Sequence, residues 1–146
     1  MSFVRIVLAA VVVTIFNQAW GFFTCGYLFA WIYFMPPVTV WRPPVEMTPM
    51  FWGLNAIGHF FLTLIFVAVL RWIAKGLSGT WLMKGVCYGF IVWLVGILPG
   101  MFATGMYMTV NPLWTIYMTV NQLIWLPLAG LLAALIALPR RQNIEA

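Results

Sequence analysis

Residues 51–72 read FWGLNAIGHFFLTLIFVAVLRW, an almost unbroken apolar run whose single full charge, Arg71, stands near its end. A bilayer core about 30 Å thick is crossed by roughly 20 helical residues. The run is therefore long enough and apolar enough to predict a transmembrane helix. The chain does not show the series of short alternating segments that membrane β-barrels require, so a helical interpretation is favoured.

Three further stretches have the same character, and we expect membrane spans at about 3–34, 81–104 and 112–138 in addition to 51–72. Little sequence is left outside these spans, and it contains no separate soluble domain. The chain is thus predicted to be an all-α membrane protein, a four-transmembrane-helix bundle that forms a single domain over residues 1–146.

Glycine and proline residues predict where these helices bend or end. The first span is longer than one crossing requires, so we expect it to tilt, to project beyond the membrane, or to bend near Gly21 and Gly26. The proline pair at 36–37 should end it, because proline lacks the N–H and restricts the residue before it. Pro99 should kink or shorten the third span, and Pro127 should kink the fourth.

The composition excludes an ordinary soluble fold. Hydrophobic residues make up 65% of the chain and charged residues only 6%, against roughly 25% charged in a soluble domain. The formal net charge of +5 comes from basic residues that flank the apolar spans. We therefore expect the lipid bilayer as the partner of these charges, and no nucleic acid.

The basic residues also predict the orientation. Six of the seven fall on one side if the predicted helices alternate up and down: Arg5, Arg71, Lys75, Lys84, Arg140 and Arg141. Only Arg42 falls on the other side, near Glu46. Because positive charge accumulates on the cytoplasmic face, this distribution predicts an even number of spans with both termini cytoplasmic, in a bacterial inner membrane. The tryptophans agree with this orientation: Trp31, Trp41, Trp52 and Trp114 would mark the outer interface, and Trp72 and Trp81 the inner one.

The predicted outer loop, residues 35–50, contains five prolines. Prolines at this density give a stiff, extended segment. Two interpretations stay open. The loop is either a rigid connector that lies on the lipid headgroups, or an exposed surface on which another membrane subunit docks.

The third span contains two GxxxG units, Gly85–Gly89 and Gly96–Gly100. Steps of four, seven and four residues keep all four glycines on one face of a regular helix. Within lipid, such a face lets a neighbouring backbone approach closely. We expect another helix to cover it, belonging either to this chain or to another subunit.

A polar stripe runs along the second span, where Asn55, His59 and Thr63 follow one another at steps of four. Uncharged polar groups at membrane depth usually face the bundle interior and bond to a neighbouring helix. We expect a hydrogen bond from His59 to a polar side chain or a backbone carbonyl.

The alternative is that His59 contacts a cofactor, as the ligand of a metal-centred tetrapyrrole or as a donor to a quinone. Candidates for its pocket are Trp20, Asn55, Trp93 and Trp125. Haem with two histidine ligands is excluded within one chain, because His59 is the only histidine. A five-coordinate metal needs only one such ligand.

Catalytic constellations are missing from the sequence. It contains no aspartate, so a Ser-His-Asp triad cannot be assembled. No cluster of Cys, His and carboxylate residues has the spacing of a zinc site. Its two acidic residues, Glu46 and Glu145, lie outside the spans, whereas ion-coupled carriers usually keep a carboxylate within the membrane. We therefore predict that the protein is not an enzyme.

Two functions remain from this inventory. The first is a non-catalytic accessory or assembly subunit of a larger integral-membrane complex, most plausibly a bioenergetic one. The alternative is a self-associating channel or small-solute carrier with a polar, uncharged lumen. Its lining would come from Asn17, Gln18, Asn55, His59, Asn121 and Gln122.

Overall fold

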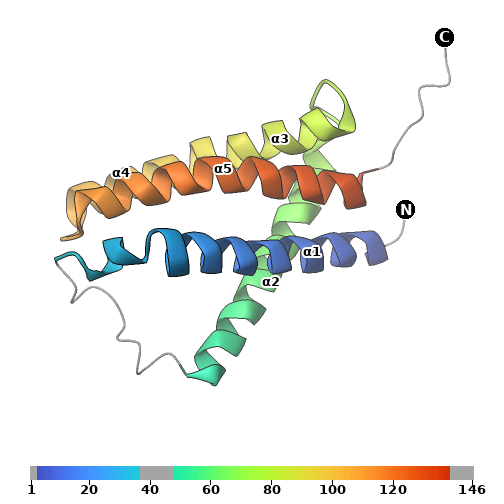
Figure 1. Ribbon diagram of the computed structural model, residues 1–146. Coiled ribbons are helices and arrows are strands. Elements are labelled where there is room, and N and C mark those ends of the chain that lie inside the picture. The colour runs from blue at the N-terminus through green and yellow to red at the C-terminus, as the bar shows by residue number, and fades with distance from the viewer. Residues whose placement is uncertain (1–2, 37–47, 139–146) are drawn as a thin grey trace, which may run out of the picture.

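The computed structural model describes residues 3–36 and 48–138, and these residues are helical apart from their short connections (Figure 1). The helices are α1 (Phe3–Gly21), α2 (Pro49–Ile73), α3 (Trp81–Val92), α4 (Leu98–Tyr107) and α5 (Pro112–Ala137). With the π-helical turns that extend α1 and join α3 to α4, they make four helical stretches long and apolar enough to cross a membrane. The prediction of an all-helical chain with four such stretches is confirmed. Most of the predicted loop 35–50, with Trp41, Arg42 and Glu46, and the residues Arg140, Arg141 and Glu145 lie outside the described residues.

Local sequence explains where three of the helices begin. Thr48, Thr80 and Asn111 are the N-caps of α2, α3 and α5, and each side chain accepts a hydrogen bond from a backbone N–H of the first turn. Pro49 and Pro112 follow two of these caps, at a position where the missing N–H costs nothing.

The first span changes its helix type in the region of Gly21 and Gly26. α1 ends at Gly21, and a π-helical turn continues the chain over Phe22–Leu28. Phe29, with φ −120°, then breaks the helix, and a short 3₁₀ helix follows at Ala30–Phe34.

The third span is interrupted by a second π-helical turn, Trp93–Ile97, which separates α3 from α4. The N–H of Leu98 bonds to the carbonyl of Trp93, five residues back. A proline ring clashes with the carbonyl four residues before it. The wider turn directly before Pro99 gives that ring room, so the interruption follows from the sequence. In contrast, α5 continues as a single α-helix through Pro127.

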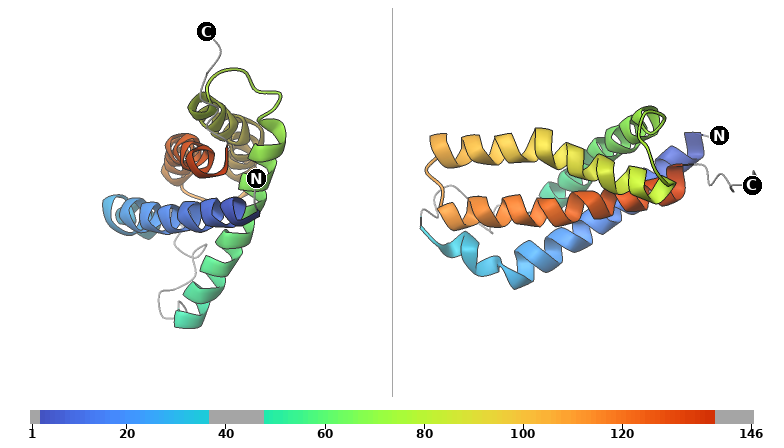
Figure 2. Two further views of the ribbon diagram at one scale, coloured as in Figure 1. Left: turned by 90° about the vertical axis from the view of Figure 1, so that its right-hand side faces the viewer. Right: turned by 90° about the horizontal axis from the view of Figure 1, so that it is seen from above.

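α5 lies at the centre of the arrangement. It packs against α1 on one side and against α3 and α4 on another, and all of these run roughly along one direction (Figures 1 and 2). α2 crosses them obliquely, and its side-chain contacts with α1 extend as far as Asn55. Its N-terminal end projects away (Figure 1). Large apolar side chains are exposed from this end to the middle of the helix: Met50, Trp52, Leu54, Ile57, Phe61 and Leu62.

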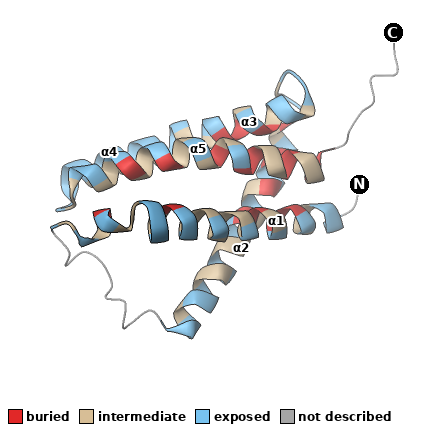
Figure 3. Ribbon diagram, in the orientation of Figure 1, coloured by how far each residue is buried: buried red, intermediate tan, exposed pale blue. Residues whose placement is uncertain are grey.

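The buried core lies at the end where α1 begins, α2 ends, α3 begins and α5 ends (Figure 3). Most of its members are small: Ala9, Ala10, Val13, Val67, Leu70, Ala74, Tyr88, Ala129, Ala133, Ala134, Ala137 and Leu138. Alanine lets helix backbones approach one another, which is how helices pack when lipid removes the usual hydrophobic drive.

Basic residues gather at this same end of the fold. Arg5 is in the first turn of α1, Arg71 is in the last turn of α2, and Lys75 follows it. Lys84 of α3 donates a 2.7 Å hydrogen bond to the carbonyl of Ala74, the residue that caps the C-terminus of α2. The start of α1 and the end of α5 lie at this end as well (Figure 1).

Candidate functional site

The most polar contact between the described helices joins α1 to α2. It consists of Thr14 and Gln18 of α1 with Asn55, His59 and Thr63 of α2, which we call the polar seam. The hydroxyls of Thr14 and Thr63 are 2.6 Å apart. The Gln18 amide lies 3.3 Å from Asn55 Oδ1 and 3.4 Å from His59 Nδ1. The stripe anticipated on α2 thus faces a neighbouring helix that carries matching polar groups.

His59 is held mainly by its own helix. Its Nδ1 lies 2.9 Å from the carbonyl oxygen of Asn55 and 3.0 Å from Asn55 Oδ1. A carbonyl oxygen only accepts, so the shorter contact requires the proton on Nδ1. In the tautomer with its single proton on Nδ1, the ring has a lone pair on Nε2. Metal-binding histidines often have this arrangement, with the other ring nitrogen bonded to a carbonyl. The hydrogen bonds alone also account for the position of the ring.

The residues proposed to surround a cofactor at His59 are not gathered there. Asn55 contacts His59, whereas the indole N–H of Trp20 donates to Asn121 Oδ1 of α5 over 2.8 Å. The indole N–H of Trp93 donates to the Thr119 carbonyl, also on α5, over 2.9 Å. Trp125 packs against the buried core. The indole N–H groups of Trp20 and Trp93 therefore both donate to α5, and Trp125 belongs to α5 itself.

A second polar group joins the end of the first span to α5, and the sequence did not identify it as a unit. Cys25 Sγ lies 3.2 Å from the hydroxyl of Tyr117. The Tyr33 hydroxyl donates to the sulfur of Met118 over 3.8 Å. Cys25 and Asn121 lie at about the same distance from the predicted outer ends of the first and fourth spans, which was the only available signal of polar contacts between these spans. Equal depth in the membrane does not identify which helices are neighbours.

The residues suggested for a channel lumen divide between these two groups. In the polar seam, Asn55 Oδ1 accepts from the Gln18 amide and from His59 Nδ1. Asn121 is buried and bonds to Trp20 between α1 and α5. These four of the six residues therefore belong to two different helix contacts, α1 with α2 and α1 with α5.

The four glycines of the third span also divide. A Cβ on Gly85 would fall 2.7 Å from the Cβ of Ala134, and one on Gly89 would overlap the Leu126 carbonyl. Both glycines are buried against α5, where Gly130 makes the reciprocal approach. Gly96 and Gly100 are exposed, and no described atom lies within 4 Å of a Cβ built on either. α5 therefore covers half of the predicted face.

Metal ligands are sparse in the described part of the chain. Among the described residues, 3–36 and 48–138, no group of three or more His, Cys, Asp or Glu side chains is placed to hold a metal ion. Cys25 and Cys87 are both free thiols.

No protein-family model, curated protein or solved structure matches this chain. The function is therefore argued from its own residues.

Proposed function

We propose that the chain is a non-catalytic accessory or assembly subunit of a larger integral-membrane complex, of a bioenergetic kind. In this proposal it is inserted in a bacterial inner membrane with both termini in the cytoplasm. The observation that carries the proposal is the unequal closure of the bundle. Its core is packed at the end where α1 begins and α5 ends, while the N-terminal end of α2, beyond the seam contact at Asn55, projects away from the other helices.

Two open surfaces support the presence of a partner. Gly96 of the π-helical turn Trp93–Ile97 and Gly100 of α4 leave a shallow strip of exposed backbone. On α2, Gly53 and Gly58 do the same among exposed apolar side chains. Small residues on a lipid-facing helix permit another helix to approach closely, and lipid alone gives them no packing advantage.

The polar seam supports a packing role over transport. Its side chains pair between α1 and α2, and His59 pairs with Asn55 within α2. Groups that line a water-filled path would instead face a common cavity. The self-associating channel therefore has no specific contact in its favour.

Purification from the native membrane in mild detergent tests the proposal. We expect the tagged chain to migrate with a stoichiometric set of other membrane proteins. A double variant, Gly96→Leu with Gly100→Leu, should keep the fold and lose these proteins, because leucine side chains would fill this glycine strip. Val95→Leu is the matched control, since it enlarges a side chain of the same span that is already 69% exposed.

A homo-oligomer that contains no other protein and conducts ions or moves solutes in liposomes would contradict the proposal. A complex that the double glycine variant retains in full would contradict the glycine strip as its contact surface.

A further inference from the structure

Three cations gather where α2 connects to α3. Arg71 is in the last turn of α2, and Lys75 follows it by about one helical turn, because Ala74 keeps a helical φ of −57° and ψ of −20°. Lys84 of α3 reaches back to the same place, where its ammonium donates to the Ala74 carbonyl over 2.7 Å. We call Arg71, Lys75 and Lys84 the basic turn.

The sequence of the connection brings α3 back to this point. Gly79 has a φ of +93°, a conformation that glycine adopts without strain. Thr80 follows as the N-cap of α3, so Lys84 stands near the start of that helix, within reach of the end of α2. Lys75 and Ser78 are both exposed, and they add an ammonium and a hydroxyl group to the connection. The connection thus offers accessible hydrogen-bond donors to an anion.

The described part of the chain does not balance the charge of the basic turn. The C-terminus of a helix carries only about −0.5 elementary charge, against three positive side chains here. Glu46 and Glu145 are the two acidic residues of the sequence, and neither belongs to the described residues, 3–36 and 48–138. Within these residues, an excess of about two positive charges therefore remains at the basic turn.

Two tryptophans indicate the depth of the basic turn in a membrane. Trp72 is 79% exposed at the end of α2, and Trp81 is the first residue of α3. Indole rings are enriched at the membrane–water interface, at the level of the headgroups. The cations beside them therefore lie where lipid phosphates are found.

We propose that the basic turn binds diphosphatidylglycerol, a phospholipid with two phosphate groups. The exposed Lys75 ammonium contacts a phosphate directly, and Arg71 and Lys84 supply further positive charge around it. Basic groups between membrane helices recognise headgroups of this kind. Two phosphates match the excess of about two charges, whereas phosphatidylglycerol has one phosphate and phosphatidylethanolamine is neutral overall. The inference goes beyond the proposed subunit role and rests only on membrane insertion, which carbonate extraction of membranes tests separately.

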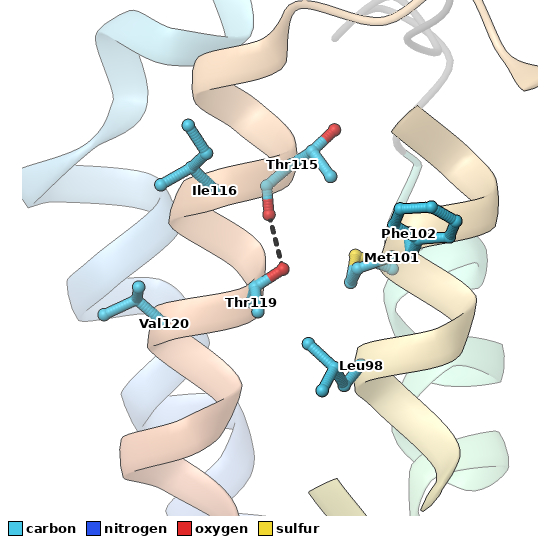
Figure 4. Close-up of a pocket in the computed structure, with 7 residues that line it drawn as sticks. All are labelled: Leu98, Met101, Phe102, Thr115, Ile116, Thr119 and Val120. Atoms are coloured by element: carbon cyan, nitrogen blue, oxygen red, sulfur yellow. Dashed lines mark hydrogen bonds between the residues drawn. The ribbon is translucent and has the colours of Figure 1, made fainter. Parts of the chain in front are cut away.

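Apolar surface elsewhere on the fold does not discriminate among these lipids. A groove of about 280 Å³ between α4 and the first half of α5 is lined by uncharged residues alone (Figure 4). One of its two threonines, Thr119, donates its hydroxyl to the Thr115 carbonyl over 2.8 Å. Acyl chains of any lipid can lie against such a surface. Selection among headgroups therefore depends on the basic turn.

Native mass spectrometry of the full chain in detergent, titrated separately with the three lipids, tests the inference. We expect saturable binding of one diphosphatidylglycerol, and roughly fivefold weaker binding of phosphatidylglycerol. Lys75→Gln should weaken the binding of diphosphatidylglycerol roughly fivefold, and its combination with Arg71→Gln roughly twentyfold, because each cation near an anionic headgroup adds a similar increment.

Two control variants separate the site from general attraction. Arg42→Gln removes the same charge on the side of the membrane that the sequence predicts to be opposite, so lipid affinity should not change. Phe102→Ala removes apolar surface from the groove and should leave the preference among headgroups unchanged. Circular dichroism of each variant establishes that the helices are intact.

Equal affinity of the Lys75→Gln and Arg42→Gln variants for diphosphatidylglycerol would overturn the inference, since the attraction would then depend on net charge alone. Equal retention of phosphatidylethanolamine by the parent chain would overturn it as well. Inorganic pyrophosphate, which has two phosphates and no acyl chain, should not displace the lipid. Displacement at equal concentration would make a soluble phosphate compound the occupant and would also overturn the inference.

Discussion

The contact between α3 and α5 and the contact between α1 and α2 join helices in two different ways. At the first, Gly85 and Gly89 let the backbone of α3 meet the backbone of α5 directly. At the second, threonine, glutamine and asparagine side chains bond across the polar seam, and His59 bonds to Asn55 within it. Both solutions suit an apolar environment, where burial of apolar surface provides no net force between helices.

This difference predicts how strongly a substitution at each contact should lower the stability of the fold. Backbones in direct contact leave no volume into which an added atom can move, so the smallest addition forces the helices apart. The polar seam has several hydrogen bonds, and the loss of one partner leaves the others in place. We therefore expect a large effect at the glycine contact and a modest one at the seam.

The largest effect is expected for Gly89→Ala. A Cβ at this position would overlap the Leu126 carbonyl and lie 2.7 Å from the Cα of Pro127, both of them backbone atoms. The free energy of unfolding should fall by about 3 kcal/mol, the upper part of the range for overpacking. Reversible unfolding in mixed detergent micelles, followed by circular dichroism, measures this quantity.

Gly96→Ala is the control within the same span. No described atom would lie within 4 Å of the new Cβ, and alanine is the better helix former. Its unfolding free energy should match or exceed that of the parent. Equal destabilisation by the two substitutions would show that the four glycines form one packed face, contrary to the fold described above.

This pair also shows how far the sequence could predict the packing. The spacing of the glycines places them on one face only if the helix stays regular. The π-helical turn at Trp93–Ile97 adds about one residue to a turn, which rotates the following helix by roughly 100°. Pro99 signals such an interruption, but the sequence does not specify a wide turn over a kink. The predicted face therefore divides at this point.

The arrangement of the helices was less predictable than their existence. Length and hydropathy define each span, and the four-residue spacing of Asn55, His59 and Thr63 predicts that they share one face of a helix. Hydropathy and spacing do not identify the helix that packs against this face, and they do not predict the oblique path of α2. Pairings such as Trp20 with Asn121 join residues far apart in the chain, so they depend on the tertiary packing.

A smaller effect is expected at the polar seam. His59→Ala removes the imidazole from Asn55, while the Gln18 amide keeps its 3.3 Å contact with Asn55 Oδ1. The unfolding free energy should fall by about 1 kcal/mol, typical of a polar contact between membrane helices. Leu62→Ala, on an exposed part of the same helix, should change it less.

The same variant tests for a cofactor. If hydrogen bonding is the whole role of His59, the visible absorbance of material purified from the native membrane will be unchanged by His59→Ala. Loss of a chromophore would instead identify His59 Nε2 as an axial ligand and would replace the packing interpretation of the seam.

The smallest loss of unfolding free energy is expected at Lys84, where the α3–α5 pair contacts the α1–α2 pair. Lys84 of α3 donates to the Ala74 carbonyl at the C-terminus of α2, and its charge faces the negative end of that helix. Lys84→Met keeps the apolar stem and removes the donor, and should cost about 0.5 kcal/mol. Lys75→Met removes an exposed cation next to the same helix end, and should cost less because water screens that charge. If the two variants lose the same stability, the effect comes from net charge, and the Lys84 hydrogen bond does not connect the α1–α2 pair to the α3–α5 pair.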